Sequence, residues 1–376
     1  MILKNAEIFD ENFDLVKADI AVGNGKIERT GQNLEGTDVH DFSGCVITPG
    51  FVDIHIHGCV GADTCDGTRE AVSKMAGHLI TEGVTSFCPT TMTVPIAKIK
   101  KVLSVIKDCM ENPPEGAAVC GANMEGPYIS AQRCGAQKAD NIRKPDWHEF
   151  KDLYEGCGGI IKLVDIAPEC DENHEFSEHA SRFCKVSIAH TMADYGQAVE
   201  AFRHGVTHVT HLFNAMSGLQ HRSPGVVGAV FDDSSVSAEI ICDGFHINPV
   251  VLRIAFRQLG ENRTVIISDS MRAAGMPDGE SELGGQKVFV KNSQARLADG
   301  TIAGSTANIH QEIKNLISYG VPLRQVIKSA TINPAREIGE ANKIGSIKAG
   351  KQADLVVMDK ELNIVSVFKN GKLNKN

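Results

Sequence analysis

An apolar stretch that ends in two histidines, VITPGFVDIHIH at residues 46–57, sets the pattern for this chain of 376 residues. Side chains two positions apart on a strand point to the same face, so we expect His55 and His57 to share one. Seven more short apolar runs follow, and each ends in polar residues: Val84–Cys88, Ala118–Glu125, Ile160–Ala167, Val186–His190, Val206–His211, Val236–Cys242 and Val265–Asp269. Eight strands that alternate with helix-like segments are typical of a (β/α)8 barrel.

Amphipathic segments between and after the runs are predicted to be helices: Arg69–Thr81, Ile96–Met110, Asp194–His204, Pro249–Leu259, Ser305–Tyr319 and Leu323–Glu340. The chain ends break the rhythm with strand-like segments that have no place in a closed barrel of eight strands: Ile2–Ile8, Ile20–Ile27, Asp354–Met358 and Ile364–Asn370. We therefore predict an α/β fold with a TIM-like barrel over residues 48–344. Residues 1–47 and 345–376 together are predicted to form a small β-sandwich domain.

Composition argues against several classes of function. Lys and Arg total 38 against 47 Asp and Glu, a net charge of −9, so no basic excess exists to hold a nucleic acid or an anionic membrane. The first residues, MILKNAEIFD, lack an apolar stretch of signal-peptide length, and no run is long enough for a transmembrane helix. Eleven cysteines without a CxxC pair are typical of reduced thiols in a cytoplasmic protein.

The polar residues that end the runs are candidate metal ligands. In α/β barrels the active site lies at the carboxyl ends of the strands. Six groups of suitable chemistry end the predicted strands: His55, His57, Glu125, His190, His211 and Asp269. Imidazole and carboxylate are the natural ligands of zinc and related divalent ions. The pattern predicts a divalent metal site, with zinc expected first and iron or another divalent ion as alternatives.

A metal with an open position and a carboxylate beside it indicates hydrolysis. The metal lowers the pKa of its water and polarises a carbonyl, while a carboxylate carries the proton to a leaving group such as an amine. Asp269 suits this proton-carrying role, since it is a lone carboxylate at the end of the eighth run. The alternative, in which Asp269 is one more metal ligand, stays open.

Longer motifs run nearly from end to end of the chain: TPGFVDIHIHG (48–58), NMEGPYIS (123–130), AHTMA (189–193), THLFNAM (210–216), HRSPGVVGA (221–229), CDGFH (242–246), ISDSMRAAG (267–275), LADGTIAGS (297–305), TINPAREIG (331–339) and GSIKAGKQADLVVMD (345–359). With these motifs the chain resembles the N-acetylglucosamine-6-phosphate deacetylases of the amidohydrolase superfamily. The last motif marks the superfamily only, whereas THLFNAM, EGP and DGFH point to the sugar-phosphate deacetylases.

The resemblance implies hydrolysis of the acetamide of N-acetyl-D-glucosamine 6-phosphate to D-glucosamine 6-phosphate and acetate. It implies one or two metal ions per chain, held by Glu125, His190 and His211, with Asp269 as the general acid/base. Residues of three loops match positions that contact the sugar: Ala136, Gln137, Asn214, Ala215, Ile302, Ala303 and Gly304.

Arg222 and His246 match the residues that hold the 6-phosphate in this family. A planar guanidinium suits a phosphate, and a protein of net negative charge needs such a local site. We expect both side chains to converge over the barrel mouth without touching the metal. Part of the phosphate site in this family can come from the partner subunit, so the resemblance also implies a homodimer.

Two positions depart from some members of the family. Gln137 stands where those members have a histidine that helps to polarise the acetyl carbonyl, so here an amide N–H is expected to serve. The His55/His57 pair is absent from other members, which leaves open whether one metal is bound or two with Glu125 between them. Lys162 is expected to be an ordinary strand residue and not a carbamylated bridge between metals.

Three other functions compete with this one. An N-acetylgalactosamine-6-phosphate deacetylase would need the same metal, acid/base and phosphate groups, and the motifs do not separate the two C4 epimers. A cyclic-amide or nucleobase amidohydrolase without phosphate specificity is disfavoured by Arg222 and the CDGFH motif. A barrel kept only as an interaction module would be expected to have lost metal ligands, and all of them are present.

Overall fold

The computed structural model describes residues 1–374, in which eight parallel strands form a barrel. In spatial and chain order these are β8 (Phe51–Ile56), β11 (Val84–Thr91), β13 (Ala122–Tyr128), β14 (Ile161–Ile166), β15 (Lys185–Ile188), β16 (His208–Val209), β17 (Ser237–Ile240) and β18 (Thr264–Ile266). Every neighbouring pair in this order is parallel. The predicted (β/α)8 fold is confirmed.

Contacts just beyond β18 bring the last strand back to the first. The backbone N–H of Asp269 donates to the carbonyl of His55 at 3.0 Å, and the Ser268 hydroxyl donates to Asp53 Oδ2 at 2.5 Å. The Asp53 side chain is fully buried, so this hydroxyl partner offsets part of the cost of removing the carboxyl group from water. The barrel therefore closes between β18 and β8, beside the predicted site residues His55 and Asp269.

Helices surround the barrel: α1 (Arg69–Leu79), α2 (Ile96–Glu111), α3 (Trp147–Gly156), α4 (Glu175–Ala180), α5 (Tyr195–Arg203), α6 (Gly225–Asp232), α7 (Pro249–Arg263), α8 (Ile309–Ser318), α9 (Leu323–Ala330) and α10 (Ile332–Glu337). Helix α2 buries Ile99, Leu103 and Ile106 on one stripe at helical spacing. Helix α5 begins with a capping box, in which Asp194 accepts from the backbone of Gln197 and the Gln197 side chain returns to the backbone of Asp194. In residues 1–374 no helix has both the length and the apolar character of a membrane span.

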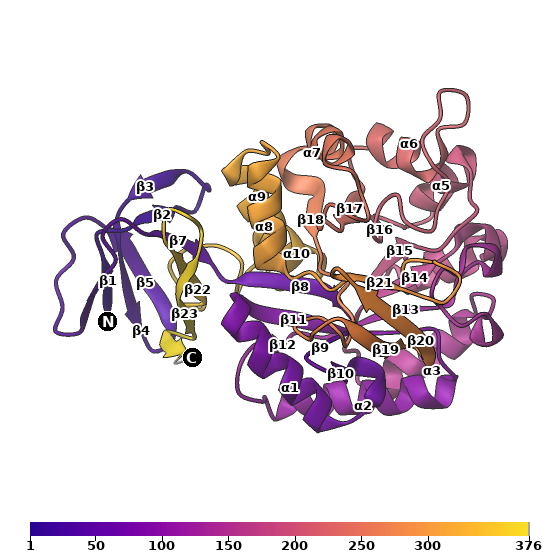
Figure 1. Ribbon diagram of the computed structural model, residues 1–376, viewed down its shortest axis with the longest axis horizontal. Helices are drawn as coiled ribbons and strands as arrows, with labels where there is room; N and C mark the ends of the chain where they lie inside the picture. The colour runs from indigo at the N-terminus through magenta and orange to yellow at the C-terminus, as the bar shows by residue number, and fades with distance from the viewer. Residues whose placement is uncertain (375–376) are drawn as a thin grey trace.

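Both chain ends build a small β-sandwich beside the barrel, as predicted (Figure 1). One sheet contains β24 (Lys372–Asn374), β23 (Ile364–Lys369), β22 (Leu355–Met358), β7 (Val46–Pro49), β2 (Glu7–Phe9) and β3 (Leu15–Lys17). The other contains β5 (Lys26–Gly31), β4 (Asp19–Gly23), β1 (Ile2–Lys4) and β6 (Val39–Asp41). Their facing apolar side chains, such as Leu3, Ile20, Ile47 and Val357, form a core of their own.

The run predicted as the first strand, residues 46–57, is two strands in two different sheets. β7 pairs with β22 and β2 in the small domain, and β8 pairs with β11 in the barrel. Gly50 lies between them, and a Cβ at this position would come within 2.2 Å of the Thr85 hydroxyl, so only glycine fits the crossing. We propose the two units that the sequence predicts, with the first crossing at Gly50 and not between residues 47 and 48, because β7 belongs to the small domain.

A three-stranded antiparallel sheet that the sequence analysis did not predict crosses the face of the barrel (Figure 1). It comprises β19 (Gly279–Leu283), β20 (Gln286–Lys291) and β21 (Gln294–Arg296). The Gln286 amide donates to the carbonyl of Ala136 at 2.6 Å, which ties the sheet to a predicted substrate loop. The Gly284-Gly285 turn between alternating strands was a hairpin signal that could have revealed it.

Candidate active site

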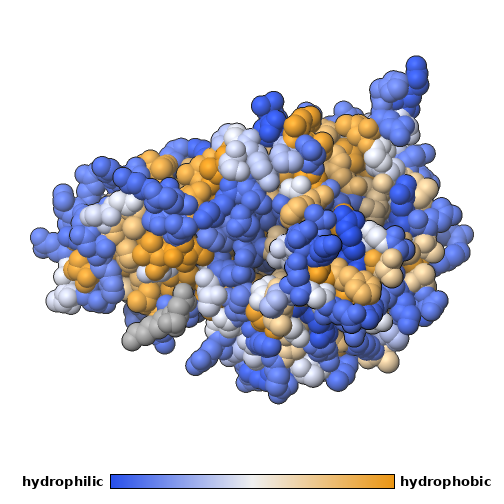
Figure 2. Space-filling view, in the orientation of Figure 1, coloured by the Kyte–Doolittle hydropathy of each residue, from blue (hydrophilic) through white to orange (hydrophobic). Residues whose placement is uncertain are grey.

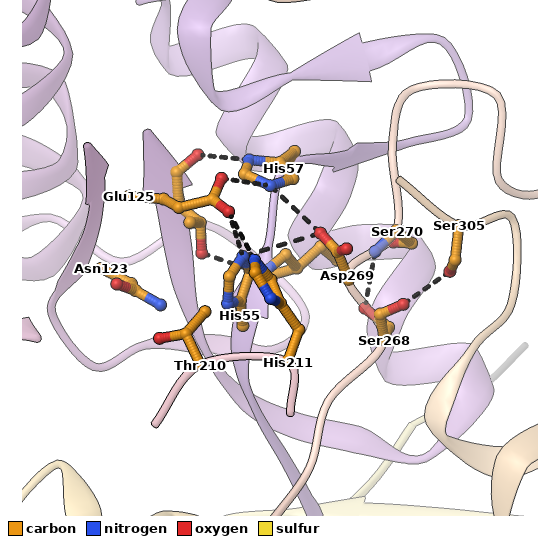
Figure 3. Close-up of polar contacts among 12 residues, drawn as sticks. His55, His57, Asn123, Glu125, Thr210, His211, Ser268, Asp269, Ser270 and Ser305 are labelled. Atoms are coloured by element: carbon orange, nitrogen blue, oxygen red, sulfur yellow. Dashed lines mark hydrogen bonds and ion pairs between the residues drawn. The ribbon is translucent and has the colours of Figure 1, made fainter. Parts of the chain in front are cut away.

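Six predicted residues meet at the carboxyl ends of the barrel strands, and we call them the carboxyl-end cluster: His55, His57, Glu125, His190, His211 and Asp269. Glu125 is at its centre, with Oε1 lying 3.0 Å from His190 Nε2 and 3.1 Å from His211 Nε2. His57 Nε2 lies 3.2 Å from both Glu125 Oε2 and Asp269 Oδ1 (Figure 3). All six residues are buried.

Strained backbone turns aim three of these side chains inward. His190, His211 and Asp269 follow β15, β16 and β18 and have positive φ angles of 45°, 31° and 45°. Residues with a side chain rarely adopt this conformation, and it is common at functional sites, where the surrounding structure over-determines it. Each strand therefore delivers its last polar side chain toward Glu125 at a local conformational cost.

Three imidazoles are oriented by contacts on their other nitrogen. His55 Nδ1 lies 2.9 Å from Glu239 Oε2, His190 Nδ1 lies 2.8 Å from the Arg133 carbonyl, and His57 Nδ1 lies 3.3 Å from the Thr90 carbonyl. An oxygen acceptor at Nδ1 favours the tautomer that carries its hydrogen there. The Nε2 lone pair then faces the cluster, which is the usual arrangement of a metal-binding histidine.

The donor set fits a divalent metal ion. His190 Nε2 and His211 Nε2 lie 3.2 Å apart, and His55 Nε2 is buried without a hydrogen-bond partner. Buried acceptors that converge in this way need a cation between them. Two groups each place their ligand atoms within 4.8 Å of one another: Glu125 with His190 and His211, and Glu125 with His55 and His57. The geometry can therefore accept one metal ion or two that share Glu125.

The charges in the cluster also favour a cation. Burial raises the pKa of Glu125, but hydrogen bonds with His190, His211 and His57 outweigh burial and hold this pKa well below its ordinary value. Burial likewise raises the pKa of Asp269, and the contact with His57 brings it below the ordinary value. Both carboxylates are therefore ionised near neutral pH. A metal and a proton would compete for the same imidazole nitrogens, because a ligand histidine must be neutral.

A cavity of about 390 Å³ opens above the cluster. Predicted residues on its wall are Ala136, Gln137, Asn214, Ala215, His246, Ile302 and Gly304. Residues that the sequence analysis did not select also line it: Met92, Gln132, Arg133, Gly135, Leu283 and Thr301. Ala303, predicted to contact the sugar, is fully buried behind the wall and is not among the lining residues. Its backbone N–H donates to the carbonyl of Ala295 at 3.0 Å, which holds this loop against β21.

Arg222 does not reach this cavity in the single chain, contrary to the expectation that it converges there with His246. It lies on the exposed loop of residues 218–223, which projects before α6 (Figure 1). His246 does line the cavity, and its Nδ1 lies 2.7 Å from Asp243 Oδ2. Burial lowers the pKa of His246, but the contact with Asp243 outweighs it and raises this pKa.

Gln137 contacts the cluster directly. Its Nε2 donates to Glu125 Oε2 at 2.5 Å, and its Oε1 accepts from the backbone N–H of Thr93 at 2.7 Å. The amide therefore has a fixed orientation, with N–H toward the cluster. Lys162, in contrast, pairs with Glu340 at 3.3 Å outside the cluster, as expected for an ordinary strand residue.

Beneath the cluster lies a buried layer of polar side chains that the sequence patterns did not predict. Glu239 on β17 contacts both His55 and His208, and its side chain is fully buried. Contacts with His55 and His208 outweigh burial and lower the pKa of Glu239 to about 2. The signal in the sequence was a charged residue inside the apolar run VSAEIIC, because a buried carboxylate requires a partner.

Comparison with known proteins agrees with this geometry. The model of the amidohydrolase family matches residues 46–374. The chain belongs to the amidohydrolase family. Among members of this family, the N-acetylglucosamine-6-phosphate deacetylase of Bacillus subtilis is 33% identical over 99% of this chain and 96% of the relative. The N-acetylgalactosamine-6-phosphate deacetylase of Escherichia coli O157:H7 is also 33% identical, over 87% of each chain.

Solved amidohydrolase structures share the whole architecture. A mutant N-acetyl-D-glucosamine-6-phosphate deacetylase from Mycobacterium smegmatis, in complex with N-acetyl-D-glucosamine-6-phosphate, superposes with a TM-score of 0.93 at 29% identity. The match covers 99% of this chain and 98% of that one. The N-acetylglucosamine-6-phosphate deacetylase from Thermotoga maritima gives a TM-score of 0.90 at 32% identity and covers 99% of both chains.

Proposed function

We propose that this amidohydrolase removes the acetyl group of N-acetyl-D-glucosamine 6-phosphate and releases D-glucosamine 6-phosphate and acetate. The observation that carries the proposal is the carboxyl-end cluster at the base of the cavity, with His246 on the cavity wall. The deacetylases of the same architecture support the choice of substrate. A cavity of about 390 Å³ is within the usual range for a small-molecule site.

We propose that Glu125, His190 and His211 hold a catalytic divalent metal, and that His55 and His57 complete a second subsite with Glu125. The histidine and carboxylate donors suit zinc first, and iron or another divalent ion second. When bound, the metal supplies Lewis acidity toward the amide carbonyl and toward water. Gln137 fixes Glu125 through its amide, whose nitrogen also donates to Met92 Sδ at 3.7 Å on the cavity wall.

Asp269 is the proposed proton carrier. Its low pKa keeps the carboxylate ionised, so Oδ1 or Oδ2 can accept a proton from the attacking water and return it to the amine nitrogen as the C–N bond breaks. Its Oδ1 lies 3.2 Å from His57 Nε2, which holds the carboxylate toward the cluster. The cavity also contacts Asp269, so a substrate amide can reach it.

We propose that His246 binds the 6-phosphate and that Arg222 of a second copy of the chain completes this phosphate site. A homodimer would bring the exposed loop of residues 218–223 over a neighbouring cavity. Exposed apolar side chains near His246 support such a contact, namely Phe245 at 52%, Val250 at 52% and Ile254 at 51% exposure. Apolar residues gather over α7 on the molecular surface (Figure 2). We also propose a cytoplasmic location, since all eleven cysteines are free.

Acetate release from three sugars tests this function. The panel contains N-acetylglucosamine 6-phosphate, its C4 epimer N-acetylgalactosamine 6-phosphate, and unphosphorylated N-acetylglucosamine. We expect kcat/KM to be highest for the first sugar and lowest for the third. A preference for the epimer would move the assignment to the galactosamine enzyme, which one relative of equal identity makes a specific alternative. Equal turnover of all three would replace it with a non-phosphate amidohydrolase.

A further inference from the structure

Four buried side chains link the carboxyl-end cluster to the opposite end of the barrel, and we call them the His–Glu chain: His55, Glu239, His208 and Glu337. His55 Nδ1 contacts Glu239 Oε2 at 2.9 Å, and Glu239 Oε1 contacts His208 Nε2 at 3.2 Å. His208 Nδ1 then faces Glu337 Oε2 at 3.2 Å. Imidazoles and carboxylates alternate along the whole path.

The far end of the His–Glu chain is anchored at the amino ends of the strands. Ser237, the first residue of β17, donates to Glu337 Oε1 at 2.9 Å. Lys185, the first residue of β15, places Nζ 3.1 Å from Glu337 Oε2. The side chains of His55, Glu239 and His208 are fully buried. Charged groups in such a place are costly unless each has partners, so the anchored contacts hold the whole row in one arrangement.

Glu239 determines how His55 presents itself to the cluster. Its carboxylate accepts from Nδ1, so His55 Nε2 faces Asp269 Oδ1 at 3.6 Å and Glu125 Oε1 at 3.8 Å. These separations are too long for hydrogen bonds, and His55 Nε2 has no other partner. The backbone N–H of His211 also lies 3.4 Å from Glu239 Oε2. One carboxylate thus contacts residues of both proposed metal subsites.

We propose that Glu239, held in place by His208 and Glu337, is a positioning residue for the metal subsite formed by His55, His57 and Glu125. This inference rests on the proposed function, because it assigns a supporting role behind the proposed metal ligands. Removing the partner of a ligating histidine lowers metal affinity by about 10–100-fold. The loss should fall mainly on this subsite, since the side-chain contact of Glu239 within the cluster is with His55.

Metal binding to the full chain tests the proposal. Chelator-treated protein is titrated with Co²⁺, and the number of sites, their affinities and the d–d absorption spectrum are recorded. Glu239→Gln should weaken the His55-containing subsite by about 10–100-fold and alter its spectrum, while the other subsite keeps its affinity. Glu312→Gln is the matched control, because Glu312 is a fully buried carboxyl in the same barrel that contacts Cys242 and lies outside the His–Glu chain.

A second pair of variants carries the test if Glu239→Gln does not fold. His208→Leu removes the donor to Glu239, whereas His208→Gln restores an N–H near the position of Nε2. Co²⁺ affinity should fall in the first variant and recover in the second. Unchanged Co²⁺ binding in Glu239→Gln overturns the positioning role, and so does an equal loss of Co²⁺ affinity in His208→Leu and His208→Gln. If the native protein still releases acetate, the proposed function is unaffected by either result. A native protein that neither binds Co²⁺ nor releases acetate overturns both.

Discussion

Both ends of the barrel interior contain buried histidines and glutamates, but the contacts of these side chains differ between the ends. In the carboxyl-end cluster, imidazole nitrogens converge on one carboxylate, and the carboxylate oxygens of Asp269 and Glu125 lie 3.6 and 3.8 Å from His55 Nε2. Toward the amino ends, His208 lies between two carboxylates, with Glu239 at 3.2 Å on one side and Glu337 at 3.2 Å on the other. The imidazole lone pairs at the carboxyl end have no cation between them, whereas the histidine at the amino end is already paired with two glutamates.

Convergence of ligand atoms, and not histidine content, distinguishes the candidate metal site. His208 has a carboxylate oxygen 3.2 Å from each of its ring nitrogens, Glu239 at Nε2 and Glu337 at Nδ1. A ring paired at both nitrogens has none left to offer a metal. In the cluster the Nδ1 contacts point the Nε2 atoms at a common centre, and the ionised Glu125 supplies the negative charge there.

Glu125→Gln should have the largest effect, because it removes the carboxylate shared by both proposed subsites. We expect metal content and acetate release to fall together, with kcat/KM lower by about 10⁴-fold or more, since a catalytic metal stabilises the transition state by several kcal/mol. Elemental analysis beside the kinetics checks this. Full metal occupancy with native turnover would remove Glu125 from the site.

Asp269→Asn separates proton transfer from metal binding within the same cluster. The variant should keep its metal and its affinity for the sugar phosphate, while kcat falls by about 10²–10⁴-fold, the usual contribution of general acid/base catalysis. Single-turnover kinetics and metal analysis of the same preparation test the split. A loss of metal would make Asp269 a ligand, and near-native kcat would exclude it from both roles.

His246→Asn should have a smaller and more selective effect at the cavity wall. Losing one charge-assisted contact with the phosphate should lower kcat/KM for the phosphorylated sugar by about 10–100-fold. Unphosphorylated N-acetylglucosamine should be affected little. The surface variant His204→Asn is the control, because His204 forms ion pairs with exposed glutamates and stacks on His174, outside the residues that line the cavity. Equal losses on both sugars would contradict a phosphate contact.

The smallest expected effect is a pH dependence of the free energy of unfolding, which arises from the pair of His208 and Glu337 at the amino ends of the strands. Contacts with His208 outweigh burial and lower the pKa of Glu337 from 4.5 to about 2, so its stabilisation is present above pH 4.5 and is lost as the pH falls through 2. The pKa of His208 is raised from 6.5 to about 9, so its stabilisation is present below pH 6.5 and is lost as the pH rises through 9.

Denaturant unfolding of native protein and Glu337→Gln across this range measures the effect. The difference in unfolding free energy should be largest between pH 4.5 and 6.5 and should shrink on either side. The variant Glu340→Gln is a control, because Glu340 pairs with lysines and not with His208. A difference that does not change with pH would show that the pair titrates as it does in the unfolded chain.

The sequence predicted the barrel and its cluster because both follow from local patterns. Each apolar run contributed one strand of the barrel, and parallel strands bring their carboxyl ends to one edge, so His190 and His211 meet although they lie 21 positions apart. Other features depended on contacts between distant segments. Nothing local placed Glu239 between His55 and His208, and no pattern showed that Arg222 lies on an exposed loop outside the lining of its own cavity.

We infer that the carboxyl-end cluster uses a divalent metal to deacetylate an amino-sugar phosphate. Its most direct test is acetate release from N-acetylglucosamine 6-phosphate by one preparation of protein, measured as purified, after chelation and dialysis, and after Zn²⁺ or Fe²⁺ is returned. We predict that chelated protein is inactive and that one of the two ions restores turnover at one or two equivalents per chain. Undiminished turnover by protein from which metal has been removed would exclude a metal-dependent reaction at this cluster.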